Sequence, residues 1–87
     1  MSTPLAFALE ETLLPTPVLV VEDEPLLQQR LRGVLQQLGY ADDALLFAPT
    51  LAQARALLSE QPVALALVEL HLPDGNGREL IAQLVRM

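Results

Sequence analysis

The chain has 87 residues, about 0.6 of a typical domain of roughly 150 residues, so it holds one small domain rather than a multidomain enzyme. Apolar residues make up 52% of it, which excludes a disordered tail. Eleven Asp and Glu stand against five Arg and no Lys, and the formal charge of −6 argues against binding a nucleic-acid backbone. The absence of Cys excludes disulfides and thiolate metal sites, and a single His71 excludes a multi-His metal site.

The N-terminal residues differ in character from the rest of the chain. Residues 1–16 form a leader, and Pro15 and Pro17 separate it from the first apolar run. Thr3 and Pro4 favour the start of a short helix there, and an irregular leader is the alternative. The leader lacks the basic region of a secretory signal. No apolar run approaches the roughly 20 residues of a membrane span, so we expect a cytoplasmic protein with no membrane segment.

Short apolar runs alternate with amphipathic segments over residues 17–87. Val18–Val21 is apolar on both faces, as a central parallel strand requires. Pro25 suits the first turn of a helix that runs to about Leu38, and Gly39 is a suitable stop. We expect one face of this helix to point into the core, because apolar residues recur along it at helical spacing: Leu27, Leu31, Val34, Leu35 and Leu38.

The second half of the chain continues this alternation. Ala44–Ala48 predicts a strand, and Thr50, with Gln53 three residues on, predicts a capped helix that ends before Pro62. Val63–Val68 predicts a third strand, buried on both faces and continuing to Leu72. Residues 73–77 (PDGNG) predict a turn, and helical spacing resumes over 78–87. Strands alternating with helices predict an α/β fold with a parallel sheet.

Acidic residues follow two of the three predicted strands. Glu22 and Asp23 come directly after the first strand, and Glu69 interrupts the end of the third. In open parallel sheets ligand sites gather at the carboxyl ends of strands, so these carboxylates converge if the two strands are neighbours. Like charges held close repel unless a cation neutralises them, and Mg²⁺ prefers oxygen ligands. The alternative is that they are solvated strand-end residues, and for Glu24 we favour that alternative.

Two stretches, Val18–Pro25 (VLVVEDEP) and Leu67–Gly77 (LVELHLPDGNG), resemble the CheY-like receiver domain of two-component response regulators. The resemblance covers residues 17–87. It implies a flavodoxin-like fold, of which this chain holds the (βα)3 portion of a (βα)5 receiver. The implied parallel sheet has strand order 2-1-3 and is flanked by helices.

The resemblance also implies a site and partners. By position, Glu22 and Asp23 match the acidic pair that binds Mg²⁺, and Glu69 matches the Asp that accepts a phosphoryl group. Glu69 would then border the metal, and His71 would lend it a backbone carbonyl. The implied partners are a sensor histidine kinase or a histidine phosphotransfer protein.

Two departures from the family shape the functional expectation. Glu69 replaces the acceptor Asp, and phosphoryl transfer tolerates little misplacement of the reacting groups. The sequence also stops after the third helix, before the family's Ser/Thr of strand four and Lys of strand five. We therefore expect a degenerate or truncated receiver module that is not phosphorylated, is not an enzyme and acts through partner binding.

The third strand would lie at the edge of such a sheet, which favours self-association through that strand. An alternative cover for the exposed apolar area is the N-terminal leader. Two other functions stay open from the sequence: a small Mg²⁺-dependent phosphoryl-handling enzyme, and a purely structural, self-associating half-domain. The enzyme is disfavoured because no base, nucleophile or basic clamp stands beside the acids.

Overall fold

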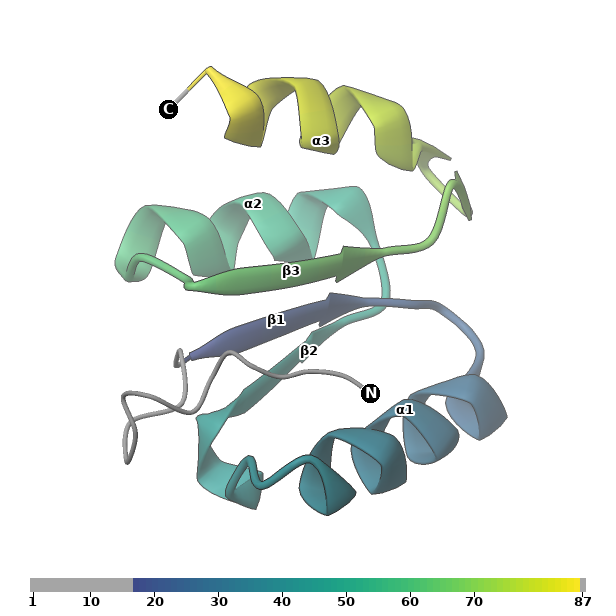
Figure 1. The fold of residues 1–87 in the computed structure, drawn as a ribbon. Coiled ribbons are helices and arrows are strands. Elements are labelled where there is room, and N and C mark those ends of the chain that lie inside the picture. The colour runs from purple at the N-terminus through teal and green to yellow at the C-terminus, as the bar shows by residue number, and fades with distance from the viewer. Residues whose placement is uncertain (1–16, 87) are drawn as a thin grey trace.

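The computed structural model describes residues 17–86, which form a three-stranded sheet flanked by three helices (Figure 1). The predicted N-terminal leader lies outside the described residues. The elements follow in the order β1 Val18–Val21, α1 Pro25–Gln37, the 3₁₀ turn η2 Asp42–Ala44, β2 Leu45–Ala48, α2 Leu51–Glu60, β3 Leu65–Val68, β4 His71–Leu72, β5 Gly75–Asn76 and α3 Gly77–Val85.

The main sheet has the strand order β2-β1-β3, and both pairings are parallel. Val18 lies opposite Leu45 and Leu65, and the pairing runs without a slip to Val21. This confirms the predicted order 2-1-3. It also confirms the first strand as central, because all four residues of β1 are buried.

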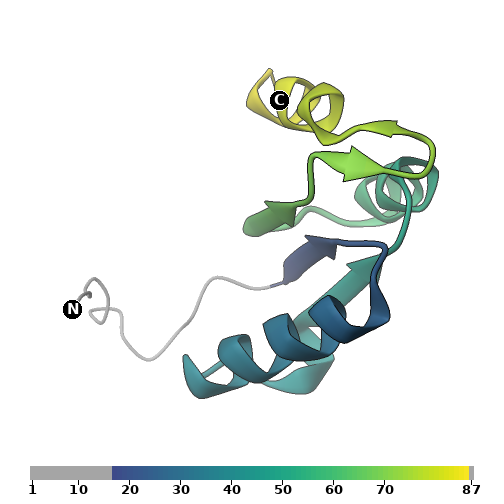
Figure 2. The ribbon, with the colours of Figure 1, turned by 90° about the vertical axis from the view of Figure 1, so that its right-hand side faces the viewer.

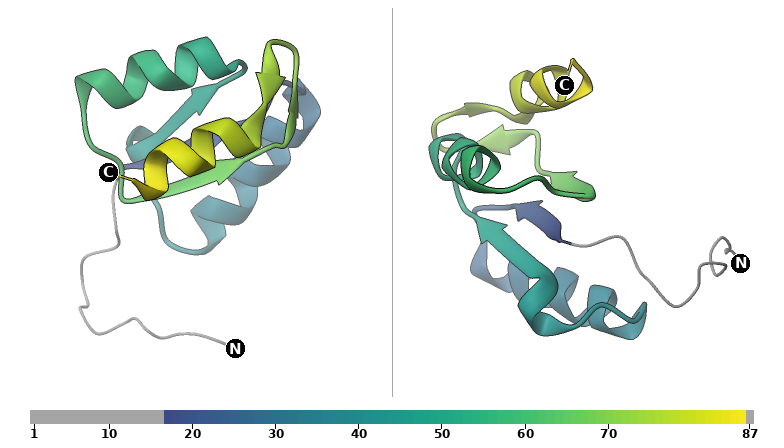
Figure 3. Two further views of the ribbon diagram at one scale, coloured as in Figure 1. Left: turned by 90° about the horizontal axis from the view of Figure 1, so that it is seen from above. Right: turned by 90° about the vertical axis from the view of Figure 1, so that its left-hand side faces the viewer.

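Alternate residues of β1 face two different cores. Leu19 and Val21 belong to a cluster with residues of α2 and α3, whereas Val18 and Val20 belong to one with Leu35 of α1. Helices α2 and α3 therefore cover one face of the sheet and α1 covers the other, as the views in Figures 2 and 3 show. Burial on both faces explains why β1 is a continuous apolar run.

The expectation that the whole apolar stripe of α1 faces the core is wrong. Only Leu35 is fully buried, and Leu31 packs partly against the same cluster. Leu27, Val34 and Leu38 are 36%, 51% and 63% exposed. The physical reason is coverage: α1 packs on β1 and β2 through Leu35 and Leu31, and the core cluster on this face does not include the other three side chains.

The third strand also differs from its prediction. It is only partly buried, with Leu65 37% exposed, because β1 is its one strand neighbour within the described chain. The strand does not continue to Leu72. It ends at Val68, and β4 turns back to pair antiparallel with β5. Likewise, Ala44 belongs to the turn η2 rather than to β2.

Capping side chains fix where two of the helices begin. The Thr50 hydroxyl accepts the Gln53 N–H at 3.1 Å at the start of α2, as the sequence predicts. The Asn76 side chain accepts the Arg78 N–H at 2.8 Å at the start of α3. None of the helices in residues 17–86 is long and apolar enough to cross a membrane.

Candidate functional site

The ends of β1 and β3 meet at one edge of the sheet. The Glu69 N–H donates to the Val21 carbonyl at 2.8 Å, and the Glu22 N–H donates to the Ala48 carbonyl at 3.0 Å. The parallel register thus extends one residue beyond the strands. It brings Glu22 and Glu69, 47 positions apart in the sequence, to neighbouring positions at the carboxyl edge.

Glu22 is the only buried charged residue in the described part of the chain, with 5% of its surface exposed. One carboxylate oxygen, Oε2, accepts the Glu24 N–H at 3.1 Å, and the Glu22 main-chain carbonyl accepts a hydrogen bond from the Gln28 side chain. No Arg of the described residues forms an ion pair with it. A carboxylate buried without a cation is costly, so this position is suited to a bound positive charge.

Glu69 and His71 belong to one tight loop after β3. The Glu69 carboxylate accepts the His71 N–H at 3.0 Å through Oε2, so it is engaged by its own loop. The imidazole of His71 is exposed to solvent. Asp23 is half-buried beside Glu22. The structure therefore brings the predicted segments together, while each of the two Glu carboxylates already accepts a backbone N–H.

The donor chemistry of this edge fits a hard divalent cation. Carboxylate and carbonyl oxygens are the ligands that Mg²⁺ takes, and Glu22 with Asp23 would hold it. Within residues 17–86, however, no group of three or more Asp, Glu or His side chains is arranged to hold a metal ion. One oxygen of the third carboxylate, Glu69, already accepts the His71 N–H.

Two glycines let the loop after β3 pass close to its neighbours. A Cβ at Gly77 would lie 2.2 Å from the Glu69 carbonyl oxygen, so α3 begins directly against the backbone of Glu69. Gly75 has a φ of +151°, which favours glycine, and a Cβ there would meet Leu51 Cδ1 at 2.8 Å. These contacts hold the loop against both β3 and α2.

Asp74 is the loop residue that sequence reasoning missed. Its carboxylate accepts the Leu51 N–H at 2.9 Å and the Ala52 N–H at 3.0 Å, at the start of α2. These two hydrogen bonds, that from Leu51 first, hold the pKa of Asp74 below its ordinary value. The residue type was a signal, since Asp is a preferred helix cap, but its partners lie more than 20 residues earlier in the chain.

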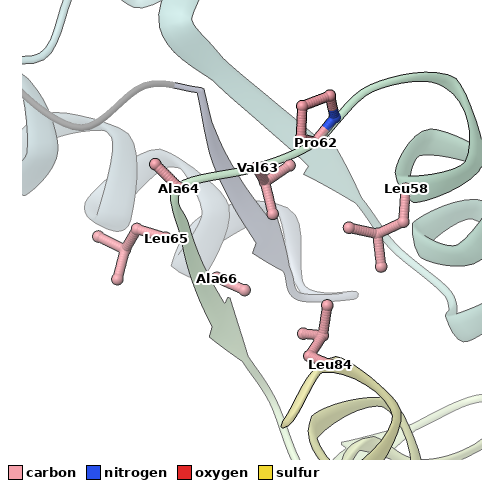
Figure 4. A pocket seen from close by; sticks show the side chains of 7 residues that line it. All are labelled: Leu58, Pro62, Val63, Ala64, Leu65, Ala66 and Leu84. Atoms are coloured by element: carbon pink, nitrogen blue, oxygen red, sulfur yellow. The ribbon is translucent and has the colours of Figure 1, made fainter. Parts of the chain in front are cut away.

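An apolar cavity of about 270 Å³ lies at the other end of β3 (Figure 4). Helix α2, the connection from α2 to β3, the beginning of β3 and the end of α3 line it with Leu58, Pro62, Val63, Ala64, Leu65, Ala66 and Leu84. Since Glu69 follows the carboxyl end of β3, this cavity is separate from the acidic edge. No charged side chain lines it, so it adds nothing to the acidic site.

The comparison with protein families identifies the family of the chain. Residues 18–87 match the model of the response regulator receiver domain. The chain belongs to this family. Receiver domains in general bind Mg²⁺ at their phosphorylation site and interact with histidine kinases or phosphotransfer proteins.

Curated relatives of this receiver domain are regulatory proteins. The chain is 38% identical over 64 residues to the TorCAD operon transcriptional regulatory protein TorR of Escherichia coli O157:H7, covering 74% of this chain and 26% of TorR. It is 34% identical over 70 residues to the photosynthetic apparatus regulatory protein RegA of Rhodovulum sulfidophilum, covering 80% of this chain and 36% of RegA. The chain thus spans about a quarter to a third of these relatives.

Solved receiver structures share the fold. The response regulator MaeR bound to beryllium trifluoride superimposes with a TM-score of 0.74 at 35% identity, over 82% of this chain and 57% of MaeR. A MaeR mutant bound to sulfate gives a TM-score of 0.75 at 34% identity, over 84% of this chain and 59% of the mutant. The flavodoxin-like assignment of the sheet is therefore confirmed.

Proposed function

We propose that this receiver domain is a non-enzymatic signalling module that works by partner binding and is not phosphorylated on Glu69. The observation that carries the proposal is the placement of a Glu, engaged with the His71 N–H at 3.0 Å, at the acceptor position after β3. Glu extends the carboxylate by one methylene relative to Asp. Because phosphoryl transfer depends on positioning, a displaced and already engaged carboxylate is a poor acceptor.

Intact mass after treatment with acetyl phosphate and Mg²⁺ tests this proposal. We expect no change in mass for the chain. A receiver domain with Asp at the acceptor position, treated in parallel, controls for the activity of the phosphodonor. An adduct of one phosphoryl group on Glu69 contradicts the proposal, and turnover of a phosphate ester with Mg²⁺ would favour the enzyme instead.

We expect Mg²⁺ to bind at the acidic edge through Glu22 and Asp23. A ligand that binds only the folded state raises the melting temperature with its concentration. Glu22→Gln and Asp23→Asn should each reduce that rise. The matched control is Asp43→Asn, which removes one exposed charge from η2 and leaves the edge untouched. An equal rise in all four proteins would place Mg²⁺ elsewhere.

We expect the partner to be a sensor histidine kinase or a histidine phosphotransfer protein, as in the family. Binding of such a protein should be the same with and without the phosphodonor, because the proposal requires no covalent change. A purified phosphotransfer protein and isothermal titration calorimetry provide the measurement. Affinity that rises when the phosphodonor is added would contradict a phosphorylation-independent module.

We also expect self-association through β3. Within residues 17–86 this strand has a neighbour on one side only, and an unpaired strand edge is a template for pairing. Leu65→Lys places a charge on the exposed strand and should shift the chain toward monomer. Light scattering at micromolar concentration tests this, and a monomeric parent chain would contradict it.

A further inference from the structure

The first turn of α2 has its free backbone donors satisfied from two distant parts of the chain. An α-helix leaves the N–H groups of its first turn without partners inside the helix. Thr50, the residue before α2, accepts the Gln53 N–H at 3.1 Å. Asp74, from the loop after β3, accepts the Leu51 and Ala52 N–H groups at 2.9 and 3.0 Å. The cap of α2 is therefore shared between a local residue and the acceptor-position loop, residues 69–77.

The same loop touches α2 at a second point. Gly75 packs so closely on Leu51 that a Cβ would lie 2.8 Å from Leu51 Cδ1. Leu51 is 2% exposed and belongs to the core cluster that also contains Leu72 and Leu80. The hydrogen bonds of Asp74 to Leu51 and Ala52 and the packing of Gly75 on Leu51 all act on the first turn of the helix, which restricts movement of the loop.

Hydrogen bonds continue through the loop from Asp74 to the acidic edge. Glu69 accepts the His71 N–H at 3.0 Å, and Gly77 donates its N–H to the Leu70 carbonyl at 2.8 Å. Between them, His71 pairs with Asn76 in the short β4–β5 ladder. Residues 69–77 are thus a hydrogen-bonded unit that is attached to α2 by the hydrogen bonds of Asp74 and by the packing of Gly75.

We infer that Asp74 is a positioning residue, a latch that couples the acceptor-position loop, residues 69–77, to the first turn of α2 so that the two open together. The inference goes beyond the proposed function, because it holds whether or not Glu69 accepts a phosphoryl group.

Residue-resolved amide hydrogen exchange on Asp74→Asn and Asp74→Ala tests the latch. Loss of a helix cap corresponds to about fivefold faster exchange through local opening. We expect this acceleration at the Leu51 and Ala52 amides, which lose their acceptor, and also at the His71 and Gly77 amides, which keep theirs. The effect should be smaller in the Asn variant, because its side chain retains one acceptor oxygen.

Exchange at the Tyr40 amide, bonded to the Leu35 carbonyl at 3.0 Å on the other face of the sheet, provides the internal reference. Expressing every rate relative to Tyr40 separates local opening from global destabilisation. Glu60→Gln, at the exposed far end of α2, is the control for loss of one negative charge. Acceleration confined to Leu51 and Ala52 would overturn the inference, since Asp74 would then be a local cap.

Discussion

Replacing Gly77 with Ala tests how closely α3 must approach the backbone of Glu69. An ideal Cβ at Gly77 would lie 2.2 Å from the Glu69 carbonyl oxygen, 3.0 Å from its carbonyl carbon and 2.7 Å from Val68 Cγ1. Two of these three atoms are backbone, so a side-chain rotation cannot relieve the overlap. The start of α3 and the end of β3 would have to separate by nearly an ångström.

Two opposing terms set the size of the effect. Ala restricts the unfolded chain more than Gly does, which stabilises the native state by about 0.4–1 kcal/mol where the conformation is compatible. Overpacking that forces the backbone to shift costs about 1–3 kcal/mol. The overlap involves the backbone of Glu69, so we expect the second term to exceed the first and the free energy of unfolding to fall by about 1–2 kcal/mol.

Urea denaturation followed by circular dichroism measures this change. For a domain of this size, each kcal/mol also lowers the melting temperature by roughly 4–8 °C. Gly33→Ala is the matched control: Gly33 lies inside α1 with no atom within 4 Å of an added Cβ, so the same substitution should stabilise by about 1 kcal/mol. If Gly77→Ala is as stable as the parent chain or more so, the close approach of α3 to Glu69 is refuted.

Three further changes test individual contacts. Leu80→Ala removes a fully buried side chain that joins α3 to the core, so urea titration should show a loss of about 2–5 kcal/mol, and no loss would contradict that packing. Thr50→Ala removes the local cap of α2 and should lower the free energy of unfolding by about 1 kcal/mol, measured by thermal denaturation. An unchanged melting temperature would show that this cap does not contribute to stability. The pKa of Asp74 is lowered by the Leu51 and Ala52 N–H groups, so its stabilisation is complete above its ordinary pKa of 3.8 and disappears as pH falls through the lower native value. Stability measured from pH 5 downward should therefore fall less steeply in Asp74→Asn, and parallel curves would refute the assignment.

The sheet and the helix starts could be predicted because their causes are local. Four consecutive apolar residues need cover on both faces, and Val18–Val21 is the central strand of the structure. Pro25 occupies the first position of α1, and Thr50 caps α2. Each of these choices is decided by a residue's own conformational preference or by its immediate neighbours.

The extent of burial could not be predicted in the same way. The spacing of Leu27, Val34 and Leu38 shows that they share a stripe with Leu35, but not how much of that stripe another element covers. Exposure of Leu65 has the same origin, because an apolar run does not show whether a strand has one neighbour or two. Periodicity identifies a face, and packing decides its burial.

The candidate site was predictable at the level of the backbone. Glu22 and Glu69 lie at one edge of the sheet because the order 2-1-3 makes β1 and β3 neighbours. The contacts of their side chains were not predictable, since they depend on rotamers and on the fold of the loop after β3. The cap that Asp74 provides to Leu51 spans 23 residues, so the local sequence does not show which helix the Asp would cap.

Three carboxylates in and beside this edge accept hydrogen bonds from backbone N–H groups. Glu22 accepts the Glu24 N–H, Glu69 accepts the His71 N–H, and Asp74 accepts two N–H groups of α2. A cation at the edge would share the carboxylates of Glu22 and Glu69 with these N–H groups, because each carboxylate has a second oxygen. A shift of the Glu69 side chain toward a metal would alter its hydrogen bond to the His71 N–H and so would favour rearrangement of its loop. Because Asp74 bonds to the first turn of α2, the inferred latch would transmit that rearrangement from the loop to the helix.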